Sequence, residues 1–234
     1  MSFENSYWNS SSVFDLYSAD NPERVLIQPI IAGIVNELKP EHLLDFGCGD
    51  AYVERLIDCE VKISLFDKNV PALMQAHKLL DNPNCSIIID EDLLPGNFYD
   101  CIILSFVLVC IEQEEEQEKI LKKLKEVKTE SGTLIVVNSH PCFLQYEFAA
   151  FKTSFDKDRF SYLEQGSPYN VTIKQPNQKP PISFIDYHWT FSFWVNKAIE
   201  CGFELEEIIE VPDKSYENLD GNNLFPPFLI LKFK

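Results

Sequence analysis

The stretch Leu43–Ala51, LLDFGCGDA, constrains the fold of this chain more than any other part. Apolar residues run into Asp45, glycines follow at positions 47 and 49, and Tyr52–Ile57 has the composition of a helix start. Glycine permits a tight turn and lets backbone approach a ligand closely, and the first turn of a helix offers unpaired N–H groups. The stretch therefore predicts a strand, a glycine turn and a helix that hold a nucleotide-like molecule at the carboxyl edge of a parallel sheet.

Two common nucleotide motifs do not fit this stretch. A dinucleotide site requires a third glycine where Tyr52 stands, and the phosphate loop G-x-x-x-x-G-K-[ST] does not occur in the sequence. The remaining pattern resembles the first motif of the class I S-adenosylmethionine (SAM) dependent methyltransferases, D/E-x-G-x-G-x-G, with Ala51 in place of the third glycine. The resemblance implies that the turn contacts the cofactor through Asp45, Phe46, Gly47, Cys48 and Gly49. The alternative is a tight turn in some other α/β protein.

Short apolar strands and helical stretches alternate along most of the chain. We expect strands at residues 42–46, 61–67, 85–89, 98–105, 133–138, 203–211 and 228–233. We expect helices at 21–38, from 53 onward, at 70–80, at 112–127 and from about 189 to 201. This alternation predicts an α/β fold with a doubly wound, mostly parallel seven-stranded sheet.

The end of the chain refines this prediction. No helix fits between the last two expected strands, so they must pair as a hairpin, and the final strand is antiparallel. This ending resembles the Rossmann-like methyltransferase fold, whereas NAD-dependent Rossmann enzymes generally lack it.

An acid at the end of the second expected strand points to a ribose. Asp67 lies 20 residues after Gly47, and a carboxylate there can accept hydrogen bonds from both ribose hydroxyls. NAD sites place an acid at the same point, so Asp67 alone does not identify the cofactor. The methyltransferase resemblance implies that Asp67 and the adjacent Lys68 contact SAM.

The resemblance assigns the rest of the cofactor to the loops after the third and fourth expected strands. Asp90 stands five residues before Pro95, which matches a family loop whose first acid takes the adenine amino group. Glu91 and Asp92 continue this loop, and the alternative interpretation is an acidic surface loop. The residues expected to line the SAM sulfur are Ser105 and Phe106.

Two segments lie outside this core, although residues 1–234 are expected to form a single domain. Residues 1–38 are predicted to form an N-terminal lid, in which the candidate cofactor contacts are Tyr7, Trp8 and Tyr17. Residues 139–186 are rich in aromatic side chains and are predicted to form a substrate cap over the carboxyl edge of the sheet. The alternatives are packing of the N-terminal aromatics on the sheet edge and a small satellite core in the insertion.

Catalytic residues are expected where the insertion meets the sheet. Methyl transfer is an in-line displacement, so the protein must align the acceptor, exclude water and, where needed, take a proton. Histidine is the usual base near neutral pH, and we rank His188 before His140, with Tyr187 beside them. Tyr146 and Tyr169 are further candidates for orienting the substrate. For each histidine the alternative is a hydrogen-bonded structural residue.

The composition limits the partners. The formal net charge of -17 would repel RNA or DNA over most of the surface, so a neutral or cationic small molecule is the preferred acceptor. The seven cysteines are scattered and form no C-x-x-C pair, which predicts reduced thiols in the cytoplasm and no zinc site. The sequence has no run of 18 apolar residues and begins without the features of a secretory signal, so no membrane segment is expected.

Together these patterns predict a SAM-dependent methyltransferase that modifies an oxygen or nitrogen of a small molecule. Three alternatives stay open: a tRNA or protein methyltransferase, a SAM-binding protein without catalysis, and an NAD-type oxidoreductase. The identity of the acceptor and the oligomeric state are left open.

Overall fold

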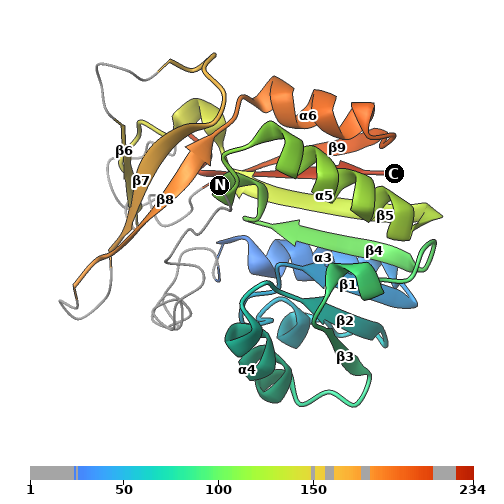
Figure 1. The fold of residues 1–234 in the computed structure, drawn as a ribbon. Coiled ribbons are helices and arrows are strands. Elements are labelled where there is room, and N and C mark those ends of the chain that lie inside the picture. Colours follow the sequence, from blue (N-terminus) through green and yellow to red (C-terminus); the bar gives the residue numbers. More distant parts are fainter. Residues whose placement is uncertain (1–23, 25, 149–150, 156–160, 175–179, 213–224) are drawn as a thin grey trace.

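The computed structural model describes residues 24, 26–148, 151–155, 161–174, 180–212 and 225–234. A seven-stranded sheet, with strand order β3-β2-β1-β4-β5-β10-β9, forms the centre of the fold (Figure 1). Its strands are β1 His42–Phe46, β2 Lys62–Phe66, β3 Cys85–Ile88, β4 Tyr99–Ser105, β5 Lys128–Ser139, β9 Leu205–Val211 and β10 Phe228–Phe233. Strands β1 to β5 pair in parallel, and β10 is antiparallel to both of its neighbours. The predicted sheet and its antiparallel last strand are confirmed.

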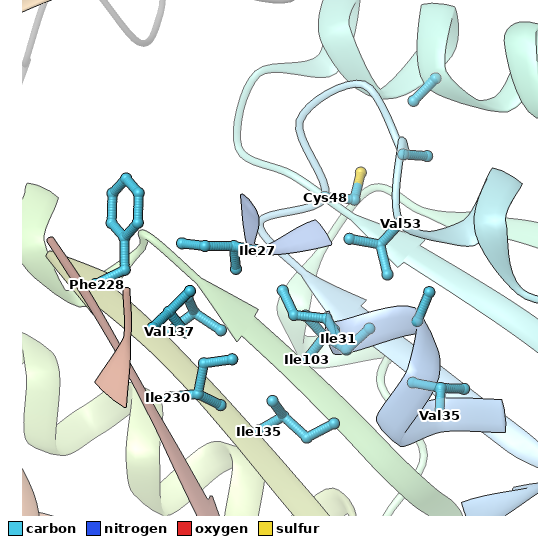
Figure 2. Packing of buried hydrophobic residues seen from close by; sticks show 14 of the residues in the cluster. Ile27, Ile31, Val35, Cys48, Val53, Ile103, Ile135, Val137, Phe228 and Ile230 are labelled. Carbon is cyan, nitrogen blue, oxygen red and sulfur yellow. The ribbon is translucent and has the colours of Figure 1, made fainter. Parts of the chain in front are cut away.

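Four described helices cover this sheet. They are α3 Gln28–Leu38, α4 Val70–Leu80, α5 Glu114–Val127 and α6 Phe191–Glu200. One core cluster joins α3 and α4 to one face of the sheet, and a second joins α5 and α6 to the other. Because successive strand residues point to opposite faces, Ile103 and Ile135 pack toward α3, whereas Ile102 and Leu134 pack toward α5 and α6. Figure 2 shows the first cluster, with α3 residues lying over β4, β5 and β10.

The strand register brings the predicted site residues to one edge. Asp45 of β1 pairs with Leu65 of β2 on one side and Ile103 of β4 on the other, and all three strands run in the same direction. After β1 the chain first adds β2 and β3 on one side of this strand and then crosses to add β4 and β5 on the other side. The strand order therefore reverses between β1 and β4, which is the switch point of the sheet. Ligands of doubly wound sheets bind at this point, beyond the carboxyl ends of the strands.

The helix expected after the glycine turn does not form. The structure has a single 3-10 turn, η1 Glu54–Leu56, and the backbone is already extended at Ile57. The Asn36 side chain of α3 accepts hydrogen bonds from the N–H groups of Asp58 and Cys59, at 2.9 and 3.1 Å. These bonds draw the chain toward α3 and on to β2, so a helix cannot continue. The prediction of a long helix here was therefore wrong.

The N-terminal segment is described only in part. Pro29 lies in the first turn of α3, where its missing N–H has no helical partner to lose. The candidate lid residues Tyr7, Trp8 and Tyr17 lie outside the described residues. Within the described part of the chain, no helix is long and apolar enough to cross a membrane.

The insertion after β5 contains a second sheet. Following the 3-10 turn η4 Pro141–Phe143, strands β6 Phe151–Ser154, β7 Ser167–Ile173 and β8 Ile182–His188 form an antiparallel sheet. We call this three-stranded sheet the cap, and it stands at the end of the main sheet toward which β4 points (Figure 1). Phe151 stacks on Phe228 of β10, with ring centroids 5.5 Å apart, so the aromatic side chains of the cap extend the main core.

Candidate functional site

The glycine turn is held against the end of β2 by its backbone. The N–H groups of Gly47 and Cys48 donate to the Phe66 carbonyl oxygen, at 2.8 and 3.1 Å. Gly47 has φ +87°, and a Cβ atom added to it would lie 2.4 Å from Val107 Cγ2. Both conformation and space therefore require glycine at this position, which leaves bare backbone at the β1–β4 edge.

Ala51 also adopts a left-handed conformation, with φ 52°. Such a conformation costs a non-glycine residue about 1–2 kcal/mol. Ala51 stands where the methyltransferase motif has its third glycine, so the chain keeps the backbone conformation of the motif without the residue that adopts it freely.

Asp67 closes the turn from the side of β2. Its Oδ2 accepts from Gly49 N at 2.9 Å, and its Oδ1 accepts from Asn69 N at 2.8 Å. Burial raises the pKa of Asp67, and the two N–H donors oppose this rise. Each carboxylate oxygen has a further lone pair, so this group can also accept hydrogen bonds from a ligand.

A second acidic group lies beneath the turn. Asp45 and Glu54 are 4% and 3% exposed, and their carboxyl groups are in direct contact. Among the residues that the structure describes, no donor is bonded to Asp45 Oδ1 or to either carboxylate oxygen of Glu54. Burial, and then the neighbouring carboxyl group, raise the pKa of Asp45 well above its usual range, and burial also raises the pKa of Glu54.

An ion-pair cluster ties Arg24, which precedes α3, to the turn. The Asp50 carboxylate binds the guanidinium groups of Arg24 and Arg55, the latter at 2.8 Å. Both guanidinium groups also lie over the Tyr52 ring, 4.5 and 4.8 Å from its centroid. Tyr52, the residue that argues against a dinucleotide turn, thus contacts two cations through its ring.

The loop after β3 forms an exposed rim beside the turn. It contains the 3-10 turn η2 Glu91–Leu93, which Asp90 caps by accepting from Asp92 N at 3.0 Å. Glu91 pairs with Lys119 of α5 at 2.8 Å. Asp90, Asp92 and Lys68 are all exposed. Their contact with a cofactor stays a prediction.

The end of β4 faces the glycine turn. Phe106 has φ 55°, and its N–H donates to the Val137 carbonyl oxygen at 2.8 Å. This strained residue redirects the chain so that Val107 packs on Gly47. Ser105 and Phe106, both partly buried, are therefore brought to the same edge as the turn and Asp67.

The two candidate histidines lie at strand ends, His188 at the end of β8 in the cap and His140 directly after β5 of the main sheet. His188 is fully buried, and its Nε2 lies 2.8 Å from the Tyr162 carbonyl oxygen. His140 Nε2 lies 3.0 Å from Glu210 Oε1, and its Nδ1 accepts from Cys142 N at 3.3 Å. Burial lowers the pKa of both rings, and Glu210 opposes this for His140. Their role as a base stays a prediction.

The tyrosines expected near the substrate lie in different surroundings. Tyr187 is partly buried, and burial raises its pKa to about 12. Tyr169 is buried on the inner face of the cap, directly opposite Asp186 in the pairing of β7 with β8. Tyr146 is 45% exposed, and its ring contacts that of Phe225 at a tilt of 57°. Of these three, Tyr169 shares the core-facing side of the cap with a carboxyl group.

A cleft opens between η4 and the cap. It has a volume of about 360 Å³ and is lined by Pro141, Cys142, Leu144, Gln145 and Tyr162. The described residues contain no group of three or more histidine, cysteine or acidic side chains placed to hold a metal ion.

Comparison with known proteins was made on the sequence and on this geometry. No protein-family model matches the sequence. A Haemophilus influenzae protein of uncharacterized function is 24% identical over 253 residues, which span 97% of this chain and 96% of that protein.

Solved structures resemble the whole chain. The CcbJ methyltransferase of Streptomyces caelestis gives a TM-score of 0.68 at 16% identity, over 100% of this chain and 99% of that one. An S-adenosylmethionine-dependent methyltransferase from Clostridium acetobutylicum gives 0.63 at 12% identity, over 96% of each chain. The PH0226 protein of Pyrococcus horikoshii gives 0.66 at 15% identity, over 100% and 99%.

This chain has the methyltransferase fold. Two features of its methyltransferase fold were not predicted from the sequence. Glu54 was expected on a helix, and the residues next to it in the sequence do not indicate that its carboxyl group is buried. The cap strands did leave a signal, because Tyr169, Val171 and Ile173 alternate with more exposed residues along β7.

Proposed function

We propose that this chain is a SAM-dependent methyltransferase that transfers a methyl group to an oxygen or nitrogen of a small molecule. One observation carries the proposal: the bare Gly47 backbone and Asp67 meet at the switch point of a sheet with the strand order of the methyltransferase fold. A dinucleotide turn would require a small residue at the position of Tyr52, whose ring instead packs against Arg24 and Arg55.

The residues present fit the cofactor. The Val107 side chain fills the space that a Cβ on Gly47 would take, so the fit rests on the buried Asp45 Oδ1, an acceptor that has no donor within the described residues. We assign the glycine turn to the methionine part of SAM, Asp67 to the ribose, the Asp90 loop to the adenine, and Ser105 with Phe106 to the sulfonium. When bound, SAM supplies an activated methyl group on a positively charged sulfur.

The chain itself would mainly align the acceptor and exclude water. The cap lies at the carboxyl end of the sheet, so it can enclose an acceptor beside the end of β4. His188 joins β8 to Tyr162, and His140 joins the end of β5 to Glu210 of β9. We therefore propose that His188 first holds the end of the cap in place and His140 the end of β5, and that any proton transfer by them is secondary.

Charge and volume support a small acceptor. The formal net charge of -17 disfavours a nucleic acid. The cleft of about 360 Å³ beside Tyr162 has the size of a small-molecule site. Its lining is mostly apolar, with one thiol, one amide and one phenol to orient a polar group.

The test is methyl transfer from SAM labelled in its methyl group. The purified protein is incubated with separate pools of small amines, small phenols and bulk tRNA, and label is counted in each product. We expect label in a small-molecule pool and none in tRNA. Label in tRNA, or in protein, would overturn the proposed acceptor class.

A further inference from the structure

The acidic pair beneath the glycine turn is the most unusual electrostatic feature of the described residues. Asp45 is the penultimate residue of β1 and Glu54 starts η1, and both side chains are almost fully buried. A buried carboxyl group ordinarily accepts hydrogen bonds, because an unpaired buried charge is costly. Here three of the four oxygens are bonded to no donor in the part of the chain that the structure describes.

The charged groups around the pair do not neutralise it. Asp67, from the end of β2, and Asp50 add negative charge and raise the pKa of Asp45 further. Arg55 favours the charged form of Glu54, but its guanidinium group is bonded to Asp50. The thiols of Cys48 and Cys85 are neutral, because burial raises the pKa of both. The surroundings therefore favour a positive charge next to the pair.

Two carboxyl groups in contact in a dry site do not both ionise, because each charge raises the pKa of the other. A single proton between them would turn one group into a donor and the other into its acceptor. An added cation would supply the missing charge and make that proton unnecessary.

We propose that Asp45 and Glu54 share one proton beneath the glycine turn, and that binding of the positively charged sulfonium cofactor expels this proton to the solvent. Glu54 thereby becomes a positioning residue that favours the charged cofactor over its uncharged product. This inference rests on the proposed function, since it requires SAM to bind at the turn.

The proposal makes the affinity for SAM depend on pH with a fixed sign. A complex that holds one proton less than the free protein binds more tightly as pH rises, by up to about tenfold per pH unit. S-adenosylhomocysteine has the same ribose, adenine and amino acid but no charge on sulfur. Proton release at Asp67, which would contact the shared ribose, is therefore common to both ligands, and the difference between the ligands reports on the sulfonium.

The test is calorimetric titration with SAM and with S-adenosylhomocysteine, each at pH 7 in phosphate and in Tris. These buffers differ in ionisation heat, so the two titrations give the number of protons released. We expect SAM to release close to one proton more than S-adenosylhomocysteine. The variant Glu54→Gln should lose this difference, and its preference for SAM should fall about tenfold. The exposed Glu60→Gln should behave as the parent protein.

Each outcome decides between the two claims. Equal proton release by both ligands in the parent protein overturns the shared proton, while binding itself upholds the cofactor. Release that persists in Glu54→Gln also overturns the proposal, because another group must then be its source. If neither ligand binds, the proposed function itself is contradicted, and the shared proton loses its basis with it. This measurement on the parent protein stands even where the variant does not fold.

A second measurement needs no cofactor. With both acids, folding raises the carboxyl pKa, so the folded state holds the proton more tightly and loses stability as pH rises. Replacing Glu54 by glutamine removes this penalty. The melting temperature of Glu54→Gln should exceed that of the parent protein more at pH 8 than at pH 5, and an equal difference at both pH values would contradict the proposal.

Discussion

The glycine turn and the junction of the cap with the main sheet both bury titratable groups, but the turn buries acids and the junction buries histidines. At the glycine turn, burial raises the pKa of Asp45, Glu54 and Asp67. Where the cap meets the sheet, burial lowers the pKa of His140 and His188. The cause is the same in both places, because a buried site disfavours whichever form is charged. The turn is thus suited to receive a cation, whereas the junction of the cap keeps neutral rings that hold two elements together.

This difference predicts opposite dependences of stability on pH. The folded acids bind protons more tightly than the unfolded ones, so their contribution is full below about pH 4 and is lost as pH rises. The folded histidines bind protons more weakly, so their contribution is full above about pH 6.5 and is lost as pH falls through that value. The free energy of unfolding, measured by urea denaturation from pH 4 to pH 9, should therefore fall as the pH rises from 4 and recover as it approaches 6.5, so it passes through a minimum. A steady rise over the whole range would show that the acids at the turn are not strained.

The largest effect should come from the turn itself. Gly47→Ala places a methyl group against Val107 at a φ of +87°. Left-handed strain and overpacking together should lower the free energy of unfolding by about 3 kcal/mol. Gly33→Ala is the matched control, because a Cβ on Gly33 of α3 meets nothing within 4 Å. It should stabilise the protein by about 0.5–1 kcal/mol. Equal effects at both glycines would contradict the described turn.

Loss of the ribose acceptor should act on binding. Asp67→Ala should weaken binding of S-adenosylhomocysteine by about 1.5–3 kcal/mol, the cost of removing hydrogen bonds to a charged group. Calorimetric titration measures this change. Asp58→Ala, an exposed acid between the turn and β2, is the control and should leave the affinity unaltered. Unchanged affinity in Asp67→Ala would remove the assignment of the cofactor to this edge.

A change in the cap should separate the two regions. His188→Ala leaves the Tyr162 carbonyl oxygen without its ring partner and opens a cavity, so it should cost about 2 kcal/mol of stability and reduce turnover. Affinity for S-adenosylhomocysteine should stay within about twofold, since removing a hydrogen bond at the cap leaves the turn intact. His188→Gln retains a hydrogen-bond donor. If the ring only positions the cap, this variant should restore turnover. A tenfold loss of affinity in His188→Ala would show that cap and turn are one unit.

The smallest effect should be that of Ala51→Gly. Relief of left-handed strain, about 1–2 kcal/mol, offsets the lost methyl burial, about 0.8 kcal/mol, and the larger entropy of the unfolded chain. Stability should stay within about 0.5 kcal/mol of the parent protein. Ala72→Gly, equally buried but helical, should cost about 2 kcal/mol. Chemical denaturation of both variants measures the contrast, and similar losses would mean that Ala51 is not strained.

Much of the main sheet could be predicted from the sequence because its elements are locally encoded. The bounds of β1, α4 and β10 were predicted without error, since apolar runs and helical spacing mark them directly. The missing helix after the turn could not be predicted, because its place is taken by hydrogen bonds from Asn36, a residue of another element.

The residues of the site also differ in how far the sequence predicts them. The position of Asp67 could be predicted because it directly follows an apolar strand. The burial of Glu54 depends on how η1 folds back on β1, and the contact of Arg24 with Asp50 joins residues 26 positions apart. Such contacts depend on tertiary packing and leave no local pattern. The cap strands alternate clearly, but the aromatic content of residues 139–186 led to the interpretation of a substrate cap or a small satellite core without assigned strands.

The most direct test of the central claim is titration of the pure protein with S-adenosylhomocysteine, with NAD as the control ligand. We predict micromolar binding of S-adenosylhomocysteine and no heat from NAD, and loss of that binding in Gly47→Ala. Binding of NAD, or of neither ligand, would contradict the assignment of the glycine turn to a SAM site.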